Sequence, residues 1–424
     1  MGGHVDPRFA RVREVFDRHF ADGEELGAAF TVHLRGEPVV DLWGGVADRR
    51  SGRVWERDTP VLTYSCSKAV TATVLLLLAQ RGLVDLAAPV ADVWPEFAAA
   101  GKAGVRVEHL LTHQAGLPVL EDAVPVADFE DQAAIADRLA RQTPLWEPGT
   151  AHGYHALTYG FLVGEVVRRA TGRSVGELVA TEIAGPLGLD LWLGAPDEVT
   201  ARAARLSAGE RPSPTTGTPE DPKAGTSEES EAGPSEESIA GTSGDPEAQT
   251  SEGPEAGTSE DLVAAMARDA LDPHSLMNRA LGNPPIHKLK GGANHPVILR
   301  AGWPALGVVT TARSLSAFYD ALISGRLLTP GTLDDALRRR VNGPDRVLRI
   351  PSSFGLGYMR PALAFRTPAR GERGAFGHTG LGGFLGLGDP EHGLAVGYTM
   401  NRMSNAVTGS LRALHLTEAV YAAL

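Results

Sequence analysis

The segment Ser67–Arg81 constrains the fold more than any other part of the sequence, because it predicts a helix without a polar face. Its residues, SKAVTATVLLLLAQR, are apolar on nearly every side, and such a helix is buried in the core of a protein. The strongly apolar run Val74–Ala79 is far too short to cross a bilayer. A chain of 424 residues, 42% of them hydrophobic, can surround this helix with one large domain or two closely packed domains.

Strand patterns lie toward both ends of the sequence, and helical patterns dominate the middle. Residues 28–34 and 38–43 flank a short glycine turn and predict a hairpin, and glycine-punctuated strands are predicted at 377–381, 383–387 and 394–400. Helices are predicted at 7–20, 67–81, 107–111, 131–142, 159–169, 175–183, 312–323 and 408–423. This order predicts an α+β fold: an antiparallel sheet built from both ends and flanked by helices, plus an all-α lobe.

Residues 206–260 have a composition unlike the rest of the chain. From Arg211 to Glu260 the sequence holds twelve Asp and Glu against two basic residues, and the unit AGTSE at Ala224 recurs at Ala256. Such a segment cannot bury enough surface to offset its ordering entropy, so we expect a disordered, acidic, low-complexity insertion. A tether for a partner is the alternative. The other predicted parts are a sheet domain of residues 1–66 and 290–424, a helical domain of residues 67–205 and a connecting helical segment of residues 261–289.

The acidic insertion also accounts for most of the net charge. Residues 211–260 contribute −10 of the formal −12, so the rest of the chain is nearly neutral and offers no basic patch for nucleic acid. A single cysteine, Cys66, excludes an intrachain disulfide. The first residues lack the basic start and apolar core of a secretory signal. We therefore expect a soluble, cytoplasmic protein without a nucleic-acid or membrane partner, whose oligomeric state the sequence leaves open.

The tetrapeptide Ser65-Cys66-Ser67-Lys68 is the first candidate for chemistry. If a helix begins just after Ser65, Ser65 and Lys68 share one face within side-chain reach. A serine hydroxyl needs a base to become a nucleophile, and a lysine amine serves as that base when burial lowers its pKa. The Ser65 N–H would also point out of the helix start toward an oxyanion. The alternative is a helix-capping serine followed by an unrelated lysine.

Two further segments could complete such a site. Tyr154 ends a loop before a predicted helix, where a phenol could relay the serine's proton. A packed loop tyrosine is the alternative. The segment Gly377-His-Thr-Gly-Leu381 predicts a strand with small residues, and its N–H groups could complete an oxyanion hole. An ordinary glycine-rich strand turn is the alternative there.

These three segments, in this order, resemble the serine β-lactamase and penicillin-binding-protein superfamily, in which S-x-x-K is followed by a Tyr or Ser motif and then by K-T-G or H-T-G. The resemblance spans nearly the whole chain except the insertion. It is also carried by three segments outside the motifs, His109–Pro118, Trp146–Gly149 and Gly307–Ala312. The branch that the chain resembles most is the class-C-like family VIII carboxylesterases, and the resemblance implies a β-lactamase/transpeptidase-like fold.

The resemblance implies a role for each site residue. Ser65 would be the nucleophile, Lys68 its base and Tyr154 the proton relay. His378 would stand where relatives place Lys or His, with Thr379 and Gly380 beside the substrate. The N–H groups of Ser65 and Leu381 would be the oxyanion donors.

Two departures from the class C β-lactamase pattern favour esters over lactams. Ala156 stands where those enzymes carry the Asn that binds the drug's amide, and His378 replaces the Lys that helps to hold its carboxylate. The sequence therefore predicts a serine carboxylesterase that hydrolyses short-chain acyl esters through an acyl-enzyme.

Other functions remain open at the level of the sequence. An acyltransferase, a D-aminopeptidase or a β-lactamase would use the same acyl-enzyme, and a penicillin-binding-like sensor module would bind without turnover. His152 and His155 lack the accompanying ligands of a zinc site, so neither a metal nor a cofactor is expected. Cys66 is expected to be a small buried residue at the helix start, and His109 and His113 are expected to be structural.

Overall fold

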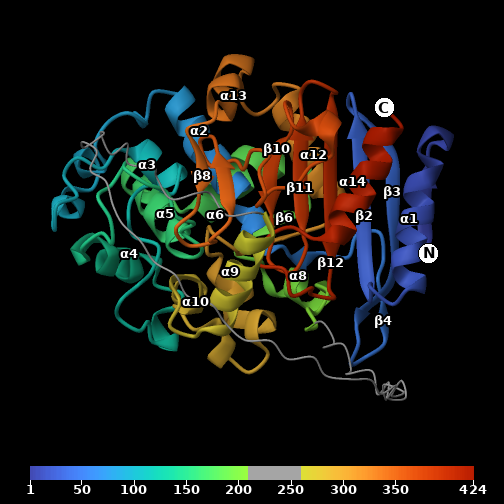
Figure 1. Cartoon of the computed structure of the whole chain (residues 1–424), viewed down its shortest axis with the longest axis horizontal. Helices are drawn as coiled ribbons and strands as arrows, with labels where there is room; N and C mark the ends of the chain where they lie inside the picture. Colours follow the sequence, from blue (N-terminus) through green and yellow to red (C-terminus); the bar gives the residue numbers. More distant parts are fainter. Residues whose placement is uncertain (209–258) are drawn as a thin grey trace, which may run out of the picture.

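The central antiparallel sheet joins the two ends of the chain. The computed structural model describes residues 1–208 and 259–424, and the sheet strands within them follow the order β1-β3-β2-β12-β11-β10, with β4 beside β3 (Figure 1). The β2–β12 pairing, which sets Ala28 opposite Met400, joins the N-terminal and C-terminal halves of the sheet. The strands are β1 (Gly2–Val5), β2 (Gly27–Leu34), β3 (Glu37–Asp48), β4 (Arg53–Val54), β10 (Phe376–Thr379), β11 (Leu385–Asp389) and β12 (Leu394–Met400).

Helices cover both faces of this sheet. On β11, Gly386 faces α12 (Ala312–Ile323), where a Cβ would lie 2.4 Å from the Tyr319 ring, so glycine permits the close approach of the helix. Asp389, three residues along the same strand, points to the opposite face and accepts a hydrogen bond from Tyr421 of α14 (Leu411–Ala422). Because strand side chains alternate between faces, α12 and α14 lie on opposite sides. Helix α1 (Ala10–Ala21) packs beside α14.

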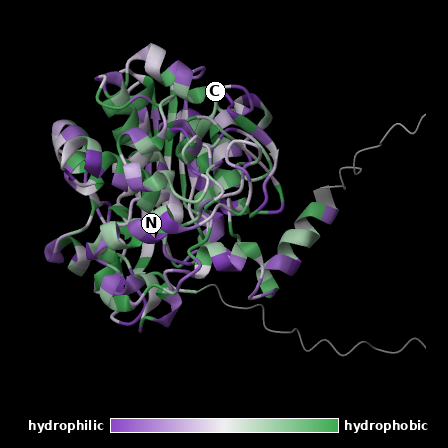
Figure 2. Cartoon of the chain, turned by 90° about the vertical axis from the view of Figure 1, so that its left-hand side faces the viewer, coloured by the Kyte–Doolittle hydropathy of each residue, from purple (hydrophilic) through white to green (hydrophobic). Residues whose placement is uncertain are grey.

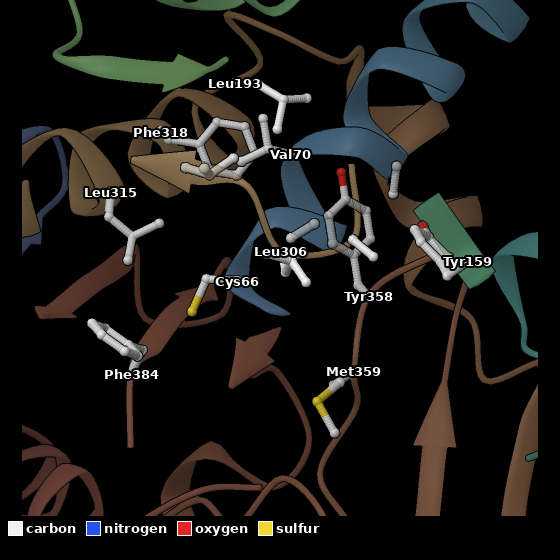
Figure 3. Close-up of a cluster of buried hydrophobic side chains, with 14 of the residues drawn as sticks. Cys66, Val70, Tyr159, Leu193, Leu306, Leu315, Phe318, Tyr358, Met359 and Phe384 are labelled. Carbon is white, nitrogen blue, oxygen red and sulfur yellow. The ribbon is translucent and has the colours of Figure 1, made fainter. Parts of the chain in front are cut away.

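The apolar helix α2 (Ser67–Gln80) lies at the centre of the molecule. Its residues from Ser67 to Leu78 are all buried, as the absence of a polar face predicts. Figure 3 shows Val70 of this helix among Leu306, Leu315 and Phe318, with Cys66 just before the helix and close to Phe384. The expectation that Cys66 is a small buried residue is confirmed.

Shorter elements surround α2 on the side away from the sheet. The helices between β5 and β7 are α3 (Val107–Leu111), α4 (Gln132–Arg141), α5 (Thr158–Thr171), α6 (Val175–Leu178), α7 (Gly185–Leu187), α8 (Asp197–Arg202), α9 (Ser259–Leu271), α10 (Leu276–Gly282) and α11 (Pro296–Ala301), and α13 (Pro330–Leu337) follows α12. A π-helical turn, Val179–Ala184, connects α6 to α7. A small sheet has the order β5-β7-β6, and β8 pairs with β9; the strands are β5 (Val61–Leu62), β6 (Leu191–Leu193), β7 (Val308–Thr310), β8 (Val341–Pro344) and β9 (Pro351–Phe354).

The structure moves some predicted boundaries. The predicted strand 383–387 begins late, because Gly380 donates its N–H to the Phe384 carbonyl and Gly382 has φ 83°, so residues 380–384 form the hairpin turn between β10 and β11. The predicted helix 408–423 begins at Leu411, where the Ser410 side chain caps the Ala413 N–H.

The predicted insertion of residues 206–260 also has different ends. The N–H groups of Leu206 and Ser207 donate to Asn294 and Asn401, which ties this stretch to the folded body. Ser259 and Glu260 open helix α9. Residues 209–258, which carry most of the acidic repeat, lie outside the described residues. The division of the chain into a sheet domain and a helical domain stays a prediction.

The peripheral helices have mixed surfaces. Figure 2 shows hydrophilic and hydrophobic stretches alternating along them. In α1 the residues Val12, Val15 and Phe16 are buried, and Glu14 between them is exposed. None of the described helices is both long enough and apolar enough to span a bilayer.

Candidate active site

Ser65 sits at the turn that leads from β5 into α2. Tyr64 adopts φ 47°, a left-handed conformation that non-glycine residues rarely take, and this tight turn leaves Ser65 half-buried at the helix entrance. The Ser67 hydroxyl donates to the Tyr64 carbonyl at 2.6 Å and accepts the N–H of Val308 at 2.9 Å. The turn is therefore fixed against β7, and Ser65 keeps one side open to solvent.

Lys68 lies one helical turn beyond Ser65 and is fully buried. Its Nζ lies 3.1 Å from Ser65 Oγ, 2.7 Å from the Ala156 carbonyl and 3.1 Å from the Ala305 carbonyl. Among the residues that the structure describes, no carboxylate pairs with this amine. Desolvation lowers the pKa of Lys68 well below its ordinary value of 10.5.

The contacts of Lys68 define the arrangement of its hydrogens. The two carbonyl oxygens can only accept, so a neutral amine donates its two N–H groups to Ala156 and Ala305. Its lone pair then faces Ser65 Oγ. This arrangement can accept the serine's proton, and it does not require a charge in the buried site before the reaction starts.

Tyr154 approaches the same serine from the loop before α5. Lys68 Nζ lies 4.8 Å from the centre of the Tyr154 ring. Burial raises the pKa of the Tyr154 phenol well above 10, and a hydrogen bond with Ser65 partly offsets this effect. The phenol is therefore protonated at neutral pH, so it can relay a proton but does not act as a standing base.

The histidines around Tyr154 hold its loop in place. His155 donates from Nδ1 to the Gly153 carbonyl at 2.7 Å and accepts the Leu117 N–H at Nε2, at 3.0 Å. His113 Nδ1 accepts the His155 N–H at 3.1 Å. His109 Nδ1 accepts the Arg106 N–H at 3.3 Å and caps α3. The structural reading of His109 and His113 is confirmed by these partners.

His378 also packs near the Tyr154 ring. It is buried on β10, with ring centres 6.0 Å apart. Its Nδ1 lies 2.6 Å from the Thr379 carbonyl, to which it donates. Desolvation, assisted by Lys68, lowers the pKa of His378 to about 3. The ring is therefore neutral, and Nε2 is a buried acceptor that has no hydrogen-bond partner among the described residues.

The hairpin turn after β10 borders the serine. A Cβ on Gly380 would lie 2.4 Å from the Thr63 carbonyl, so only glycine allows this contact with the turn before Ser65. Leu381 follows in the turn, outside the strand in which the sequence analysis placed it. Among the described residues, the N–H groups of Ser65 and Leu381 have no acceptor. Donors of this kind can stabilise an oxyanion.

Thr379 faces away from His378 and is engaged by the loop before α14. Its hydroxyl lies 2.7 Å from the Thr408 hydroxyl, which in turn donates to the Ala364 carbonyl at 2.8 Å. Both threonines line a cavity of about 190 Å³ between β10 and α14. A substrate carboxylate at Thr379 would have to displace Thr408.

Two groups that build this site could not be predicted from the sequence. One is the Ala305 carbonyl, which binds Lys68. The other is the buried carboxylate of Asp345, which accepts the N–H of Tyr154 at 3.0 Å. Main-chain carbonyls leave no trace in a sequence, and Asp345 stands in an unremarkable turn-forming stretch, NGPDRV. No motif signals either group.

A competing serine pattern occurs elsewhere in the chain. Gly172-Arg-Ser-Val-Gly176 matches G-x-S-x-G, the pattern of the α/β-hydrolase nucleophile elbow, which needs a strand-to-helix turn. Here the segment links two helices, α5 and α6. Ser174 is the exposed N-cap of α6 and forms a capping box with Glu177. This serine is a helix cap.

This chain is similar to known proteins in both sequence and structure. A sequence model of the Beta-lactamase family covers residues 12–421. The esterase/beta-lactamase LipL of Mycobacterium tuberculosis is 34% identical over 413 residues, which cover 95% of this chain and 83% of the relative. Esterase EstB of Burkholderia gladioli is 32% identical over 198 residues, 42% of this chain and 50% of the relative.

Solved structures also match the whole chain. A family VIII carboxylesterase has a TM-score of 0.79 at 32% identity and covers 100% of this chain and 99% of its own. A penicillin-binding protein homologue from Caulobacter crescentus has a TM-score of 0.78 at 36% identity, with the same coverage. These matches confirm the resemblance and the α+β, β-lactamase/transpeptidase-like fold that the sequence predicts. The chain belongs to the Beta-lactamase family.

Proposed function

We propose that the protein is a serine carboxylesterase that hydrolyses short-chain acyl esters through an acyl-enzyme on Ser65. The observation that carries the proposal is the 3.1 Å contact between Ser65 Oγ and the fully buried Lys68 amine. A lysine that burial holds neutral is a base ready to accept a proton at neutral pH. The relatives named esterase and carboxylesterase support the same reaction class.

In the acylation step, Ser65 Oγ attacks the ester carbonyl carbon and its proton passes to the lone pair of Lys68. The carbonyl oxygen becomes an oxyanion, which the N–H groups of Ser65 and Leu381 would stabilise. The C–O bond to the alcohol then breaks. The Tyr154 hydroxyl gives its proton to the leaving alkoxide and takes the proton from Lys68, so that both groups return to their starting state.

In the deacylation step, water replaces the alcohol. The same groups remove a proton from water as it attacks the acyl carbon, and they return a proton to Ser65 Oγ as the acid leaves. His378 stays neutral throughout. Its unpaired Nε2 can accept a hydrogen bond from a group that approaches the Tyr154 ring.

Two features favour esters over lactams and other carboxylate-bearing substrates. Position 156 offers a methyl side chain, and its carbonyl is already bound to Lys68. The Thr379 hydroxyl is engaged with Thr408. A lactam would therefore find neither an amide partner at position 156 nor a free hydroxyl for its carboxylate.

The test compares p-nitrophenyl acetate with a chromogenic cephalosporin for the wild type, Ser65→Ala and Ser174→Ala. We expect the wild type and Ser174→Ala to hydrolyse the ester at equal rates, and Ser65→Ala to lose about 10³-fold or more in kcat/KM. Intact mass after ester addition should show an acetyl adduct on the wild type and on Ser174→Ala. Full ester turnover by Ser65→Ala would contradict the proposal, and faster turnover of the cephalosporin would replace esterase with β-lactamase.

A further inference from the structure

We propose that Asp345 is the positioning residue of the catalytic tyrosine: its buried carboxylate binds the Tyr154 backbone and thereby sets the phenol against Ser65. The inference deepens the proposed function and rests on it. Asp345 lies just after β8, in a part of the chain far in sequence from the three motifs. It does not contact the reacting atoms, so its effect would pass through Tyr154.

The buried carboxylate of Asp345 accepts hydrogen bonds from its own turn and from Tyr154. It is 3% exposed, and its Oδ1 accepts three backbone N–H groups, from Tyr154 at 3.0 Å, Val347 at 2.8 Å and Leu348 at 2.9 Å. Its Oδ2 accepts the Ser352 hydroxyl at 2.8 Å. Two of the N–H groups belong to its own turn, so Tyr154 supplies the backbone bond that reaches across to another segment.

The turn that contains Asp345 contacts the loop of Tyr154 at several points. His152 Nε2 lies 2.9 Å from the Ser352 hydroxyl, and because that hydroxyl donates to Asp345, the histidine is the donor. The Arg346 N–H donates to the His152 carbonyl at 3.2 Å. The Arg346 guanidinium lies 5.4 Å from the Trp146 ring centre. The loop before α5 is thus held along its length. Asp345 holds it at the backbone N–H of Tyr154, the residue that carries the phenol.

Glycine at position 153 lets the two segments come this close. A Cβ there would lie 2.8 Å from the Trp146 ring and 3.2 Å from the side chains of Arg346 and Val347. The residue before Tyr154 therefore has no room to shift toward the turn. A tyrosine whose backbone is fixed on both sides keeps its phenol in one orientation, which a proton relay requires.

The charge of Asp345 acts in the same direction as its geometry. Burial is the main cause of the high pKa of the Tyr154 phenol, and the negative charge of Asp345 raises that pKa further. Cys66 acts on the phenol in the same direction as Asp345, but burial raises the pKa of its thiol and favours the neutral form. Burial lowers the pKa of Lys68, His113 and His378, the basic groups near the ring, which favours their neutral forms. Asp345 is then the anion that favours the protonated phenol.

In the described part of the chain, no lysine or arginine pairs with Asp345. A buried carboxylate without a counter-ion costs stability unless several N–H groups bind it. A purely structural turn could bind its own two N–H groups with a neutral asparagine. The bond to Tyr154 and the retained charge are what an asparagine would weaken.

The experiment is a double-mutant cycle between Asp345→Asn and Tyr154→Phe, with kcat and KM measured on p-nitrophenyl acetate. Asparagine keeps an oxygen for the three N–H groups and removes the charge. We expect Asp345→Asn to lower kcat about tenfold with little change in KM, because it weakens a positioned proton transfer. In the Tyr154→Phe background the same substitution should change kcat by less than about twofold.

The matched control is Asp389→Asn. Asp389 is a fully buried carboxylate on β11 that binds Tyr421, His392 and the Glu391 N–H, remote from the β10 turn. Asp389→Asn should lower thermal stability, as we expect of Asp345→Asn, and should leave kcat per folded molecule unchanged.

An equal loss from Asp345→Asn in both tyrosine backgrounds, or no loss at all, would overturn the inference. The parallel measurement on wild type and Ser65→Ala separates this result from the proposed function. Ester turnover by the wild type that is lost in Ser65→Ala upholds the esterase whatever Asp345→Asn does. No turnover by the wild type would overturn both.

Discussion

Two of the buried basic side chains, Lys68 and Arg412, are held in opposite ways. Lys68 is surrounded by two carbonyls and the Ser65 hydroxyl, and no described carboxylate pairs with it. Arg412 of α14 lies 2.7 Å from a carboxylate oxygen of buried Glu25 and also donates to the carbonyls of Glu24, Gly382 and Arg402. The Tyr398 hydroxyl donates to the same carboxylate.

The difference lies in the counter-ion. Without one, burial lowers the pKa of Lys68, which favours the neutral amine. With one, the pKa of Arg412 is raised, although desolvation is the largest single influence and acts downward. Arg412 therefore keeps its charge and joins α14 to the segment before β2. One buried base is suited to chemistry, and the other holds elements together.

The largest expected effect comes from removing the unpaired base. Lys68→Met keeps the length of the side chain and its apolar packing but removes the proton acceptor of Ser65. We expect kcat/KM for p-nitrophenyl acetate to fall by about 10³-fold. Stability should stay equal or rise, because a buried amine with no counter-ion is replaced by an apolar group. Ester kinetics and urea unfolding on the same samples check both halves.

A large loss of unfolding free energy in Lys68→Met would contradict the contrast between Lys68 and Arg412, because it would make Lys68 a residue that stabilises the fold. Lys102 offers a matched comparison, because it is another lysine whose Nζ donates to carbonyls, those of Ala99 and Gln142. Lys102→Met should leave ester hydrolysis by the folded enzyme unchanged.

The second effect comes from breaking the paired base. Arg412→Met leaves the Glu25 carboxylate buried without its cation, and removing one partner of a buried pair costs about 3–5 kcal/mol. Burial is the main cause that raises the pKa of Glu25 to about 7. Arg412 lowers that pKa, so its removal raises the pKa of Glu25 further, and the loss of stability should grow as the pH rises above 7. Unfolding is therefore measured at pH 8. The readout is the urea midpoint at unchanged m-value.

The second variant Glu25→Gln/Arg412→Met removes both charges. It should recover part of the lost stability, because no uncompensated ion remains. A double variant no more stable than Arg412→Met alone would mean that the packing of Arg412, rather than its charge, holds α14. In both variants, kcat per folded molecule should stay within about threefold of the wild type, because Glu25 does not contact the proposed reacting groups and Arg412 reaches the turn beside them only through the Gly382 carbonyl.

The sequence predicted the site of Lys68 better than that of Arg412. A helix without a polar face has to be buried, so a lysine in its first turn is a buried lysine, and the structure brings Ser65, Lys68, Tyr154 and His378 together. Arg412 was invisible because its partner Glu25 is 387 residues away and no local pattern pairs them. Asp345 and the Ala305 carbonyl were missed for the same reason, since contacts between distant segments leave no periodicity.

The fold shows the same difference between features that local sequence determines and features that distant contacts determine. The apolar helix at 67–81, the helices at 107–111 and 312–323 and the strand at 394–400 were predicted at their observed places because local periodicity determines them. The short strands β5, β6 and β7 were missed, since two or three residues carry no periodic signal. The turn at 380–384 was read as strand because glycine permits both conformations, and its close contacts decide between them.

The smallest expected effect is a difference in how stability depends on pH. The pKa of Lys68 in the folded protein lies well below the value of 10.5 expected when it is exposed on unfolding. Between those values the unfolded chain binds one more proton than the folded chain. Raising the pH disfavours the state that holds the extra proton, so stability rises with pH across this window and levels off above 10.5.

The measurement is the unfolding free energy of wild type minus that of Lys68→Met, from pH 7 to pH 10. It should rise with pH below 10.5, by at most about 1.4 kcal/mol per pH unit, the value for one proton. Arg412 adds no slope there, because its raised pKa keeps it charged in both states. A flat difference would mean that Lys68 is charged in the folded protein. Its lone pair could not then face Ser65, and the two buried bases would differ only in their partners.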